Sequence, residues 1–177
     1  MGQEGREAQG PATVRPTEPQ VKEGDAAPDF ELLSTSGKQV RLSGLRGAPV
    51  VLYFYPEDHT PGCTLEAKGF RNYFDGISLH KAAILGVSQD NHENDCGFRD
   101  KHALPFELLS DEEGDVHDLY GAWQRTLLGK TRVRRCTFLL DPDGRVAKVY
   151  PKVNPLGHPR QVVADLEDLV RRWKERA

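Results

Sequence analysis

The chain has 177 residues and a formal net charge of −3, a size that fits one domain around a single core. The slightly acidic balance excludes the basic footprint of a protein that binds nucleic acid or an anionic membrane surface. No run approaches the ~20 apolar residues of a membrane span, and the first residues lack the basic and apolar parts of a secretory signal, so we expect a cytoplasmic protein.

The beginning of the chain has little to bury. Residues 1–20 are mostly Gly, Pro, Gln, Glu and Thr, which cannot offset the entropy of ordering by burying apolar surface. We therefore expect a disordered N-terminal tail over residues 1–20 and one domain over residues 21–177.

The first half of the domain predicts a hairpin and then alternating strands and helices. Apolar residues on either side of Ser36-Gly37 indicate an N-terminal β-hairpin. The run at 50–55 is β-branched and aromatic throughout, as in a central strand covered on both faces. A helix is expected from 64 to about 74, and a second buried strand at 82–87.

The second half continues the alternation. A helix is expected from about 91 to 102 and a third buried strand at 137–140. The sequence Asp141-Pro142-Asp143-Gly144 indicates a hairpin turn into a strand at 146–150, and an amphipathic helix follows over 159–176. The order predicts an α/β protein with a central mixed sheet flanked by helices and an N-terminal hairpin extension, and it resembles a thioredoxin-like fold.

The three cysteines, Cys63, Cys96 and Cys136, are too few and too widely spaced for a secreted disulfide scaffold. No CxxC pair indicates zinc, the histidines lack metal-ligand spacing, and neither GxxxxGK[ST] nor GxGxxG occurs. We therefore predict no metal and no cofactor, and three thiols that are free at rest.

Cys63 occupies a position that favours the thiolate. It lies at the start of a predicted helix, just past the end of the strong strand, where unpaired N–H groups and the helix dipole supply partial positive charge. Thr60 can bring a hydroxyl to the same pocket. Pro56 and Pro61 stiffen the loop by fixing φ. The arrangement suits a sulfur nucleophile, whereas His59 in the same loop is expected to be exposed and not to act as a base.

The pattern Pro56-x-x-x-Thr60-x-x-Cys63 resembles the signature of the peroxiredoxins (AhpC/TSA family), and the similarity is greatest to the bacterioferritin comigratory protein or peroxiredoxin Q group. Further matching motifs are Ala27-Pro28-Asp29-Phe30, Tyr53-Phe54-Tyr55-Pro56, Leu104-Pro105-Phe106, Leu109-Ser110-Asp111 and Arg135-Cys136-Thr137-Phe138. The resemblance implies a thiol-dependent peroxidase in which Cys63 attacks hydrogen peroxide or an organic hydroperoxide and becomes a sulfenic acid.

The resemblance also implies an active-site arginine, for which Arg135 is the match, with Arg132 and Arg134 as competitors in the same basic stretch. A guanidinium beside Cys63 would favour the thiolate and hold the peroxide oxygens through forked hydrogen bonds. Glu66, one turn into the helix, could orient that arginine or could be an exposed carboxylate.

The sequence departs from the resembled group at the resolving cysteine. Many members carry it five residues after the peroxidatic cysteine, but Lys68 occupies that place here. We prefer Cys96, which would require local unwinding because a disulfide needs Cα atoms within about 7 Å. The alternatives are a one-cysteine mechanism with an external thiol, and Cys136, which we expect to be a buried structural thiol.

Two other classes of function were weighed against peroxide reduction. A disulfide oxidoreductase of thioredoxin fold would need two close thiols, and CxxC is missing. A binding or chaperone module would not need Pro56, Thr60, Cys63 and Arg135 together. Thioredoxin as the reductant is implied by the resemblance only, and either a monomer or a dimer is compatible with it.

Overall fold

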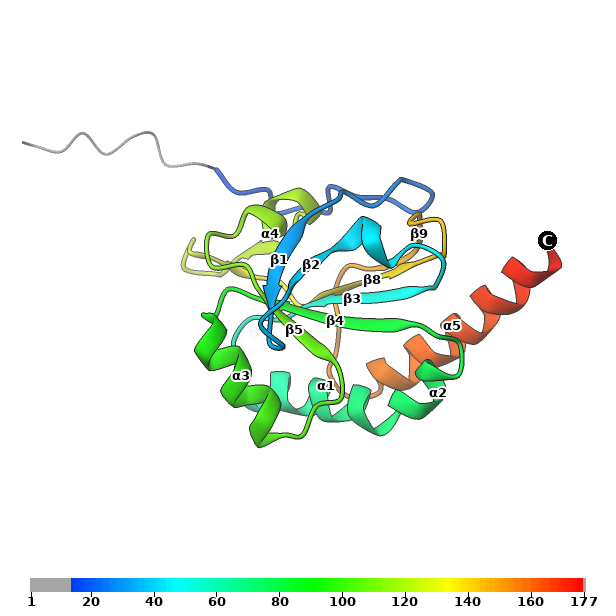
Figure 1. Ribbon diagram of the computed structural model, residues 1–177. Coiled ribbons are helices and arrows are strands. Elements are labelled where there is room, and N and C mark those ends of the chain that lie inside the picture. Colours follow the sequence, from blue (N-terminus) through cyan, green and yellow to red (C-terminus); the bar gives the residue numbers. More distant parts are fainter. Residues whose placement is uncertain (1–13, 177) are drawn as a thin grey trace, which may run out of the picture.

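The structure, a computed structural model, describes residues 14–176. One mixed sheet of seven strands, in the order β2-β1-β5-β4-β3-β8-β9, forms its centre (Figure 1). The strands are β1 (Glu31–Ser34), β2 (Gln39–Arg41), β3 (Val50–Phe54), β4 (Ala83–Ser88), β5 (Glu107–Ser110), β6 (Trp123–Arg125), β7 (Thr131–Val133), β8 (Cys136–Leu140) and β9 (Val146–Tyr150). The helices are α1 (Pro61–Asn72), α2 (Phe74–Ser78), α3 (His92–Lys101), α4 (Asp115–Tyr120) and α5 (His158–Glu175), with a 3-10 turn η1 (Leu42–Leu45). The predicted α/β class is confirmed.

The central strand β3 is buried along its whole length. It pairs in parallel with β4 and antiparallel with β8, so that Phe54 lies opposite both Val87 and Cys136. A strand covered on both faces has no solvent side to mark with polar residues, which explains its continuous apolar sequence.

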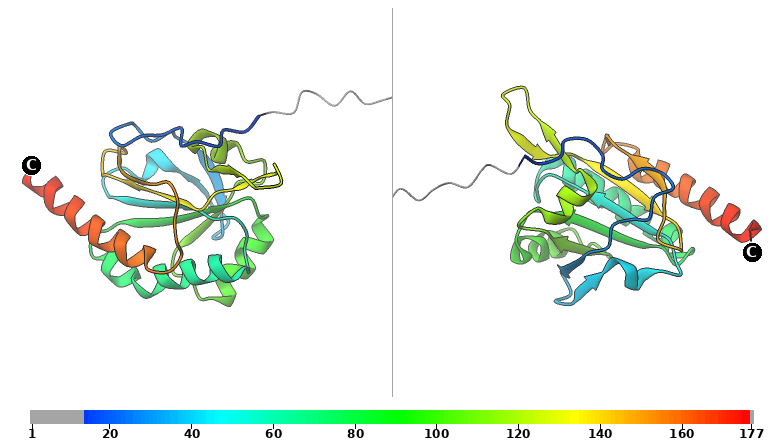
Figure 2. Two further views of the ribbon diagram at one scale, coloured as in Figure 1. Left: turned by 180° about the vertical axis from the view of Figure 1, so that it is seen from behind. Right: turned by 90° about the horizontal axis from the view of Figure 1, so that it is seen from above.

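The two faces of the sheet carry separate cores. Helices α1, α2, α3 and α5 cover one face, and α4 and the N-terminal segment lie on the other (Figures 1 and 2). Alternate residues of β3 and Tyr55, which follows it, supply the two cores: Val51, Tyr53 and Tyr55 face α1 and α5, whereas Leu52 and Phe54 face α4.

The predicted elements are present, with shifted ends. Helix α1 begins at Pro61 instead of residue 64, because Thr60 has the extended conformation of an N-cap and Pro61 fits the first helical position. The short elements that were not predicted are η1, α2, β5, α4 and the β6–β7 hairpin. Each of these helices and strands has six residues or fewer, too short for a clear periodicity.

The tail expected over residues 1–20 lies partly outside the described residues, which begin at 14. The stretch 14–20 contains no helix or strand, yet it makes definite contacts. The Arg15 guanidinium forms an ion pair with Asp118 and lies 4.4 Å from the centre of the Trp123 ring. Gln20 N–H donates to the carbonyl of Tyr120.

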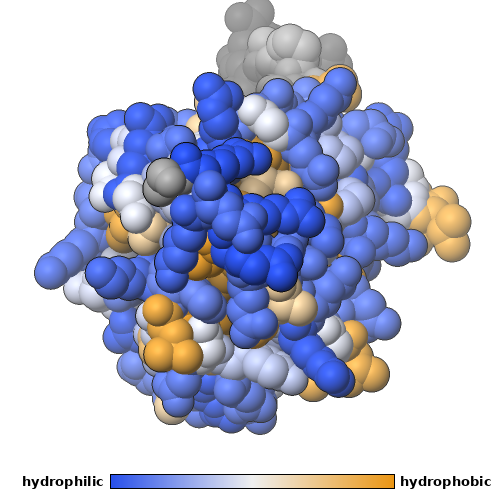
Figure 3. Space-filling view, turned by 90° about the vertical axis from the view of Figure 1, so that its right-hand side faces the viewer, coloured by the Kyte–Doolittle hydropathy of each residue, from blue (hydrophilic) through white to orange (hydrophobic). Residues whose placement is uncertain are grey.

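One face of the molecule is mostly polar at its surface. The face in Figure 3 is largely hydrophilic, and its apolar residues form separate patches. Within the described residues, none of the helices has the length and apolar character needed to cross a membrane.

Candidate active site

The site begins where β3 ends and α1 starts. After Pro56 the loop passes through His59, which has φ 60°, and reaches Thr60. The Thr64 N–H closes the first helical turn on the Thr60 carbonyl at 2.9 Å. Cys63 lies inside this first turn, where backbone N–H groups have no partner within the helix. It is only 1% exposed, so any molecule that reacts with this sulfur must enter a closely fitted site.

Arg135 contacts this sulfur directly. Its Nη2 donates to Cys63 Sγ at 3.3 Å, and its Nη1 donates to Glu66 Oε1 at 3.1 Å. Arg135 immediately precedes β8, and the β3–β8 pairing places Cys136 opposite Phe54. The sheet register therefore brings the predicted arginine to the mouth of α1.

Glycine at position 62 makes room for the guanidinium. A Cβ at Gly62 would lie 3.0 Å from Arg135 Nη2. Any larger residue would press on the atom that contacts the sulfur. This glycine therefore permits the close approach of the guanidinium to the sulfur.

Glu66 is completely buried, which decides between the two roles left open for it. Burial raises its pKa to about 7, against the opposing effect of Arg135. Burial lowers the pKa of Arg135, but Glu66 and Cys63 outweigh this and the net shift is upward. The carboxyl group holds one edge of the guanidinium and leaves the other edge for sulfur.

Thr60 and Pro56 lie on the outer side of the site. The Thr60 hydroxyl donates to the Glu57 carbonyl at 2.9 Å, so its oxygen lone pairs remain available as acceptors. Pro56 and Arg135 line a surface pocket of about 190 Å³. The rest of its lining is Gln124, Arg132, Arg134, Lys152 and Val153.

Cys96 lies on α3 and is half-buried. Its Sγ is 3.5 Å from the Thr35 carbonyl oxygen and 3.5 Å from His92 Nε2. Burial raises the pKa of this thiol. All three cysteines are free, and the Cys96 thiol is hydrogen-bonded to Thr35 and His92 and not to Cys63.

Cys136 and His59 have the surroundings expected of residues outside the chemistry. Cys136 is fully buried in the sheet, and burial raises its pKa to about 12. Such a thiol remains protonated and inert at neutral pH. His59 is exposed, with its ring edge-on to Phe98 at 5.3 Å.

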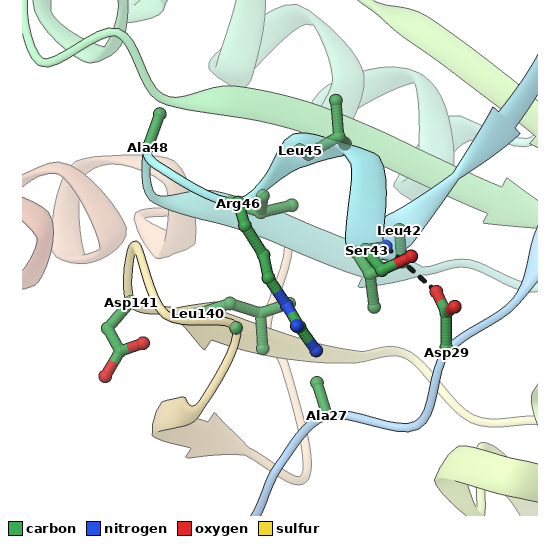
Figure 4. Close-up of a pocket in the computed structure, with 11 residues that line it drawn as sticks. Ala27, Asp29, Leu42, Ser43, Leu45, Arg46, Ala48, Leu140 and Asp141 are labelled. Carbon is green, nitrogen blue, oxygen red and sulfur yellow. Dashed lines mark hydrogen bonds between the residues drawn. The ribbon is translucent and has the colours of Figure 1, made fainter.

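A second cavity lies away from Cys63. Figure 4 shows it between η1, the segment that carries Ala27 and Asp29, and the end of β8, with Arg46 extended across it. Asp29 closes one side by accepting from Ser43 N–H at 2.9 Å. The volume of this cavity is about 10 Å³, which leaves room for one water at most. The cavity therefore cannot hold a substrate.

The sequence reading missed one aromatic neighbour of the site. Tyr53 is 1% exposed, and its hydroxyl has no hydrogen-bond partner among residues 14–176. Burial raises the pKa of this hydroxyl, and the nearby Glu66 and Cys63 raise it further. The two-residue alternation of β3 puts Tyr53 on the face that α1 covers. That alternation was the available signal, but the uniformly apolar run concealed it.

Comparison with known proteins gives consistent matches. The model of the AhpC/TSA family matches residues 23–149. Peroxiredoxin Bcp of Bacillus subtilis is 40% identical over 152 residues, which cover 84% of this chain and 97% of that protein. Peroxiredoxin Bcp of Escherichia coli is 37% identical over 161 residues, with 89% and 98% covered.

Solved structures agree with these matches. The bacterioferritin comigratory protein of Xanthomonas campestris superposes with a TM-score of 0.79 at 31% identity, covering 86% of this chain and 99% of that one. BcpB of Mycobacterium tuberculosis gives a TM-score of 0.76 at 37% identity, covering 84% and 98%. The chain therefore belongs to the AhpC/TSA family and is a peroxiredoxin of the Bcp group, an enzyme that reduces peroxides with a cysteine thiol.

Proposed function

We propose that Cys63 is the peroxide-reducing cysteine and that Arg135, Thr60 and Pro56 complete its site. The observation that carries this proposal is the 3.3 Å contact between Arg135 Nη2 and Cys63 Sγ at the first turn of α1. A permanent cation and a helix N-terminus together favour the thiolate, which is the nucleophilic form.

In the proposed reaction, the Cys63 thiolate attacks the terminal oxygen of the hydroperoxide. An S–O bond forms as the O–O bond breaks, so that sulfur loses two electrons and becomes a sulfenic acid. The departing oxygen takes a proton and leaves as water or an alcohol. Arg135 can hold both oxygens during the transfer, and the lone pairs of Thr60 can accept from the protonated oxygen.

Cys96 is the proposed resolving residue. Its thiol would attack the sulfenic sulfur, form the Cys63–Cys96 disulfide and release water. Its position on α3, half-buried and next to His92, supports this role better than the buried, protonated Cys136 does. Because Cys96 contacts Thr35 and His92 in the reduced state, resolution requires α3, α1 or both to open locally.

The alternative is a one-cysteine cycle in which an external thiol reduces the sulfenic acid. This cycle is favoured because Cys63 Sγ contacts Arg135 while Cys96 Sγ contacts Thr35 and His92, so the two sulfurs have different partners. Mass spectrometry without reductant, after one equivalent of peroxide, separates the two mechanisms. A Cys63–Cys96 linked peptide supports resolution by Cys96, whereas a persistent sulfenic acid or a mixed disulfide at Cys63 supports the external thiol.

Substrate and partners follow from the same chemistry. The Xanthomonas campestris relative is described as having alkyl peroxide reduction activity, and we propose hydrogen peroxide and organic hydroperoxides as substrates here. Thioredoxin is the proposed reductant, because it supplies the dithiol that a protein disulfide requires. Three free thiols fit a reducing, cytoplasmic setting, and we propose a monomer as the basic unit.

The proposal is tested by Cys63→Ser, with Cys136→Ala as the matched control. We expect the first variant to lose peroxide consumption to the level of the uncatalysed reaction, because a serine hydroxyl is not ionised at neutral pH. The control should keep turnover. Circular dichroism establishes that both variants fold, and normal turnover by a folded Cys63→Ser protein would reject the assignment.

A further inference from the structure

A buried acidic cluster lies beside the loop that leads to Cys63. Asp58 is 6% exposed, and both of its carboxylate oxygens are buried without a hydrogen-bond donor. Its side chain meets those of Asp90 and Asp95, with one carboxylate oxygen of each residue within 4.8 Å of the others. None of these three carboxylates has an ion-pair partner among residues 14–176.

Asp95 belongs to α3 and is fully buried. One of its oxygens accepts from the Ser88 hydroxyl at 2.8 Å, and the other accepts from the Ser110 hydroxyl. Two hydroxyl donors identify Asp95 as the member that carries negative charge. Asp90 accepts from the Asp58 backbone N–H at 2.7 Å.

Asp58 and Asp95 are buried and Asp90 is half-buried. Carboxylates this close and without a cation cannot all be ionised in such surroundings. Either a proton or a metal ion must reduce the charge. A hard divalent cation needs about six or more oxygen ligands, yet both oxygens of Asp95 already face serine hydroxyls and Asp90 faces an amide. A proton needs only one donor and one acceptor, and Asp58 next to Asp95 provides them.

We propose that Asp58 and Asp95 share one proton, and that the resulting acid–carboxylate hydrogen bond holds the Cys63 loop against α3. The two residues are positioning residues. The bond joins the loop that precedes α1 to the helix that carries Cys96, in the region whose local opening the proposed Cys63–Cys96 disulfide requires. This last consequence rests on the proposed function, whereas the shared proton does not.

The titration of the pair follows from its surroundings. The pKa of Asp58 is raised to about 9, chiefly by burial, then by a hydrogen bond to Asp95 and the charge of Asp95, with a smaller effect of Asp90. The Tyr55 hydroxyl acts in the opposite direction. Burial also raises the pKa of Asp95, while Ser110 and Ser88 lower it. Because an open loop exposes Asp58 to water, its proton is lost on opening at any pH between its ordinary value and about 9.

The test compares Asp58→Asn, Asp58→Ala and the exposed control Asp75→Asn by hydrogen exchange. Protection of amides in 57–64 and 92–99 is measured near pH 6 and pH 8 and corrected for intrinsic exchange. In the wild type and in the control, the opening equilibrium should rise by up to about a hundredfold over this range. In Asp58→Asn the rise should disappear, because an amide donates the same hydrogen bond without a titrating proton. Asp58→Ala should be open at both pH values.

Three contrary results would each count against the proton shared by Asp58 and Asp95. A flat wild-type profile, or an Asp58→Asn profile as steep as the wild type, would overturn the shared proton. Protection of these segments by millimolar Mg²⁺ or Ca²⁺ in the wild type, but not in Asp58→Asn, would also overturn it in favour of a cation. These measurements need no peroxide, so their failure is distinct from failure of the proposed peroxidase chemistry.

Discussion

At the scale of single residues, the proposed chemistry depends on a short series of contacts. Glu66 holds one edge of the Arg135 guanidinium at 3.1 Å, and the other edge donates to Cys63 at 3.3 Å. These contacts link the buried carboxyl group of Glu66 to the buried sulfur of Cys63. Small displacements within it should therefore affect the reaction more than they affect folding.

Gly62→Ala tests the fit of the guanidinium. The new Cβ would lie 3.0 Å from Arg135 Nη2, so Arg135 should shift away from the sulfur. We expect kcat/KM for hydrogen peroxide to fall roughly tenfold, about 1.4 kcal/mol of transition-state stabilisation. Stability should hold or increase, since alanine favours a helix over glycine by up to about 1 kcal/mol.

The matched control is Gly97→Ala in α3, where a Cβ meets nothing within 4 Å. It should gain helix stability and keep its activity. If Gly62→Ala is as active as this control in a peroxide-consumption assay, the close approach of Arg135 to Cys63 is not needed for the reaction.

We expect the substitution Glu66→Gln to change the pH dependence of the free energy of unfolding. Burial raises the pKa of Glu66 from 4.5 to about 7, so the folded protein retains a proton that the unfolded chain has released. The favourable contribution of this proton to the free energy of unfolding is complete below pH 4.5. It is lost as the pH rises through 7, by about 3 kcal/mol in total. Glutamine cannot titrate, and the variant should lose this slope.

Thermal unfolding of both proteins between about pH 5 and pH 8 checks this prediction. Relative to the wild type, Glu66→Gln should be more stable at the alkaline end than at the acid end. Parallel stability curves would mean that Glu66 titrates near its ordinary value, contrary to its burial.

At the scale of elements, the start of α3 determines how readily Cys96 becomes available. Asn91 caps this helix by accepting from Asn94 N–H at 2.8 Å, and Glu93 and Asp95 lie in the first turn, where acidic side chains complement the helix dipole. Cys96 lies just beyond that turn. Stabilising or removing the cap should therefore change the rate of resolution.

Asn91→Ala removes the cap at a cost of about 1 kcal/mol, which corresponds to about fivefold in a local opening equilibrium. We expect the Cys63–Cys96 disulfide to form several-fold faster after a peroxide pulse, as measured by acid quench and mass spectrometry. Asn91→Asp keeps a capping oxygen and should behave like the wild type. A lower stability with an unchanged rate of disulfide formation would show that opening of α3 does not limit resolution.

At the scale of the whole molecule, charge is distributed unevenly although the net charge is only −3. The pocket beside Pro56 is lined by four cations, Arg132, Arg134, Arg135 and Lys152, and by no acid. Such a pocket raises the local concentration of anions and speeds their approach, and salt weakens the effect.

Lys152→Glu tests this local field. We expect the second-order rate with a carboxylate-bearing hydroperoxide to fall several-fold at low salt and to recover at high salt. The rate with neutral hydrogen peroxide should change little. Lys38→Glu, an exposed reversal in the β1–β2 turn, makes the same change in net charge elsewhere and should alter neither rate. Equal effects of the two variants would assign the result to net charge instead of the pocket.

The sequence by itself determined the features that are local in the chain. The apolar run of β3 and the place of Cys63 near the start of the following helix depend on neighbouring residues, and they were predicted. The start of that helix at Pro61, with Thr60 as the N-cap, was placed three residues too late. The short elements α2, η1, β5, α4 and the β6–β7 hairpin were not predicted, because segments this short depend on tertiary contacts more than on local periodicity.

Only the tertiary structure decided what surrounds the sulfur. The contact of Arg135 with Cys63 requires the antiparallel register of β3 and β8. The burial of Glu66 requires the layer of helices on its face of the sheet, and the meeting of Asp58 with Asp95 requires α3 to pack beside the Cys63 loop. These relations join residues far apart in the chain, and burial, which sets their charge, exists only after the chain has folded.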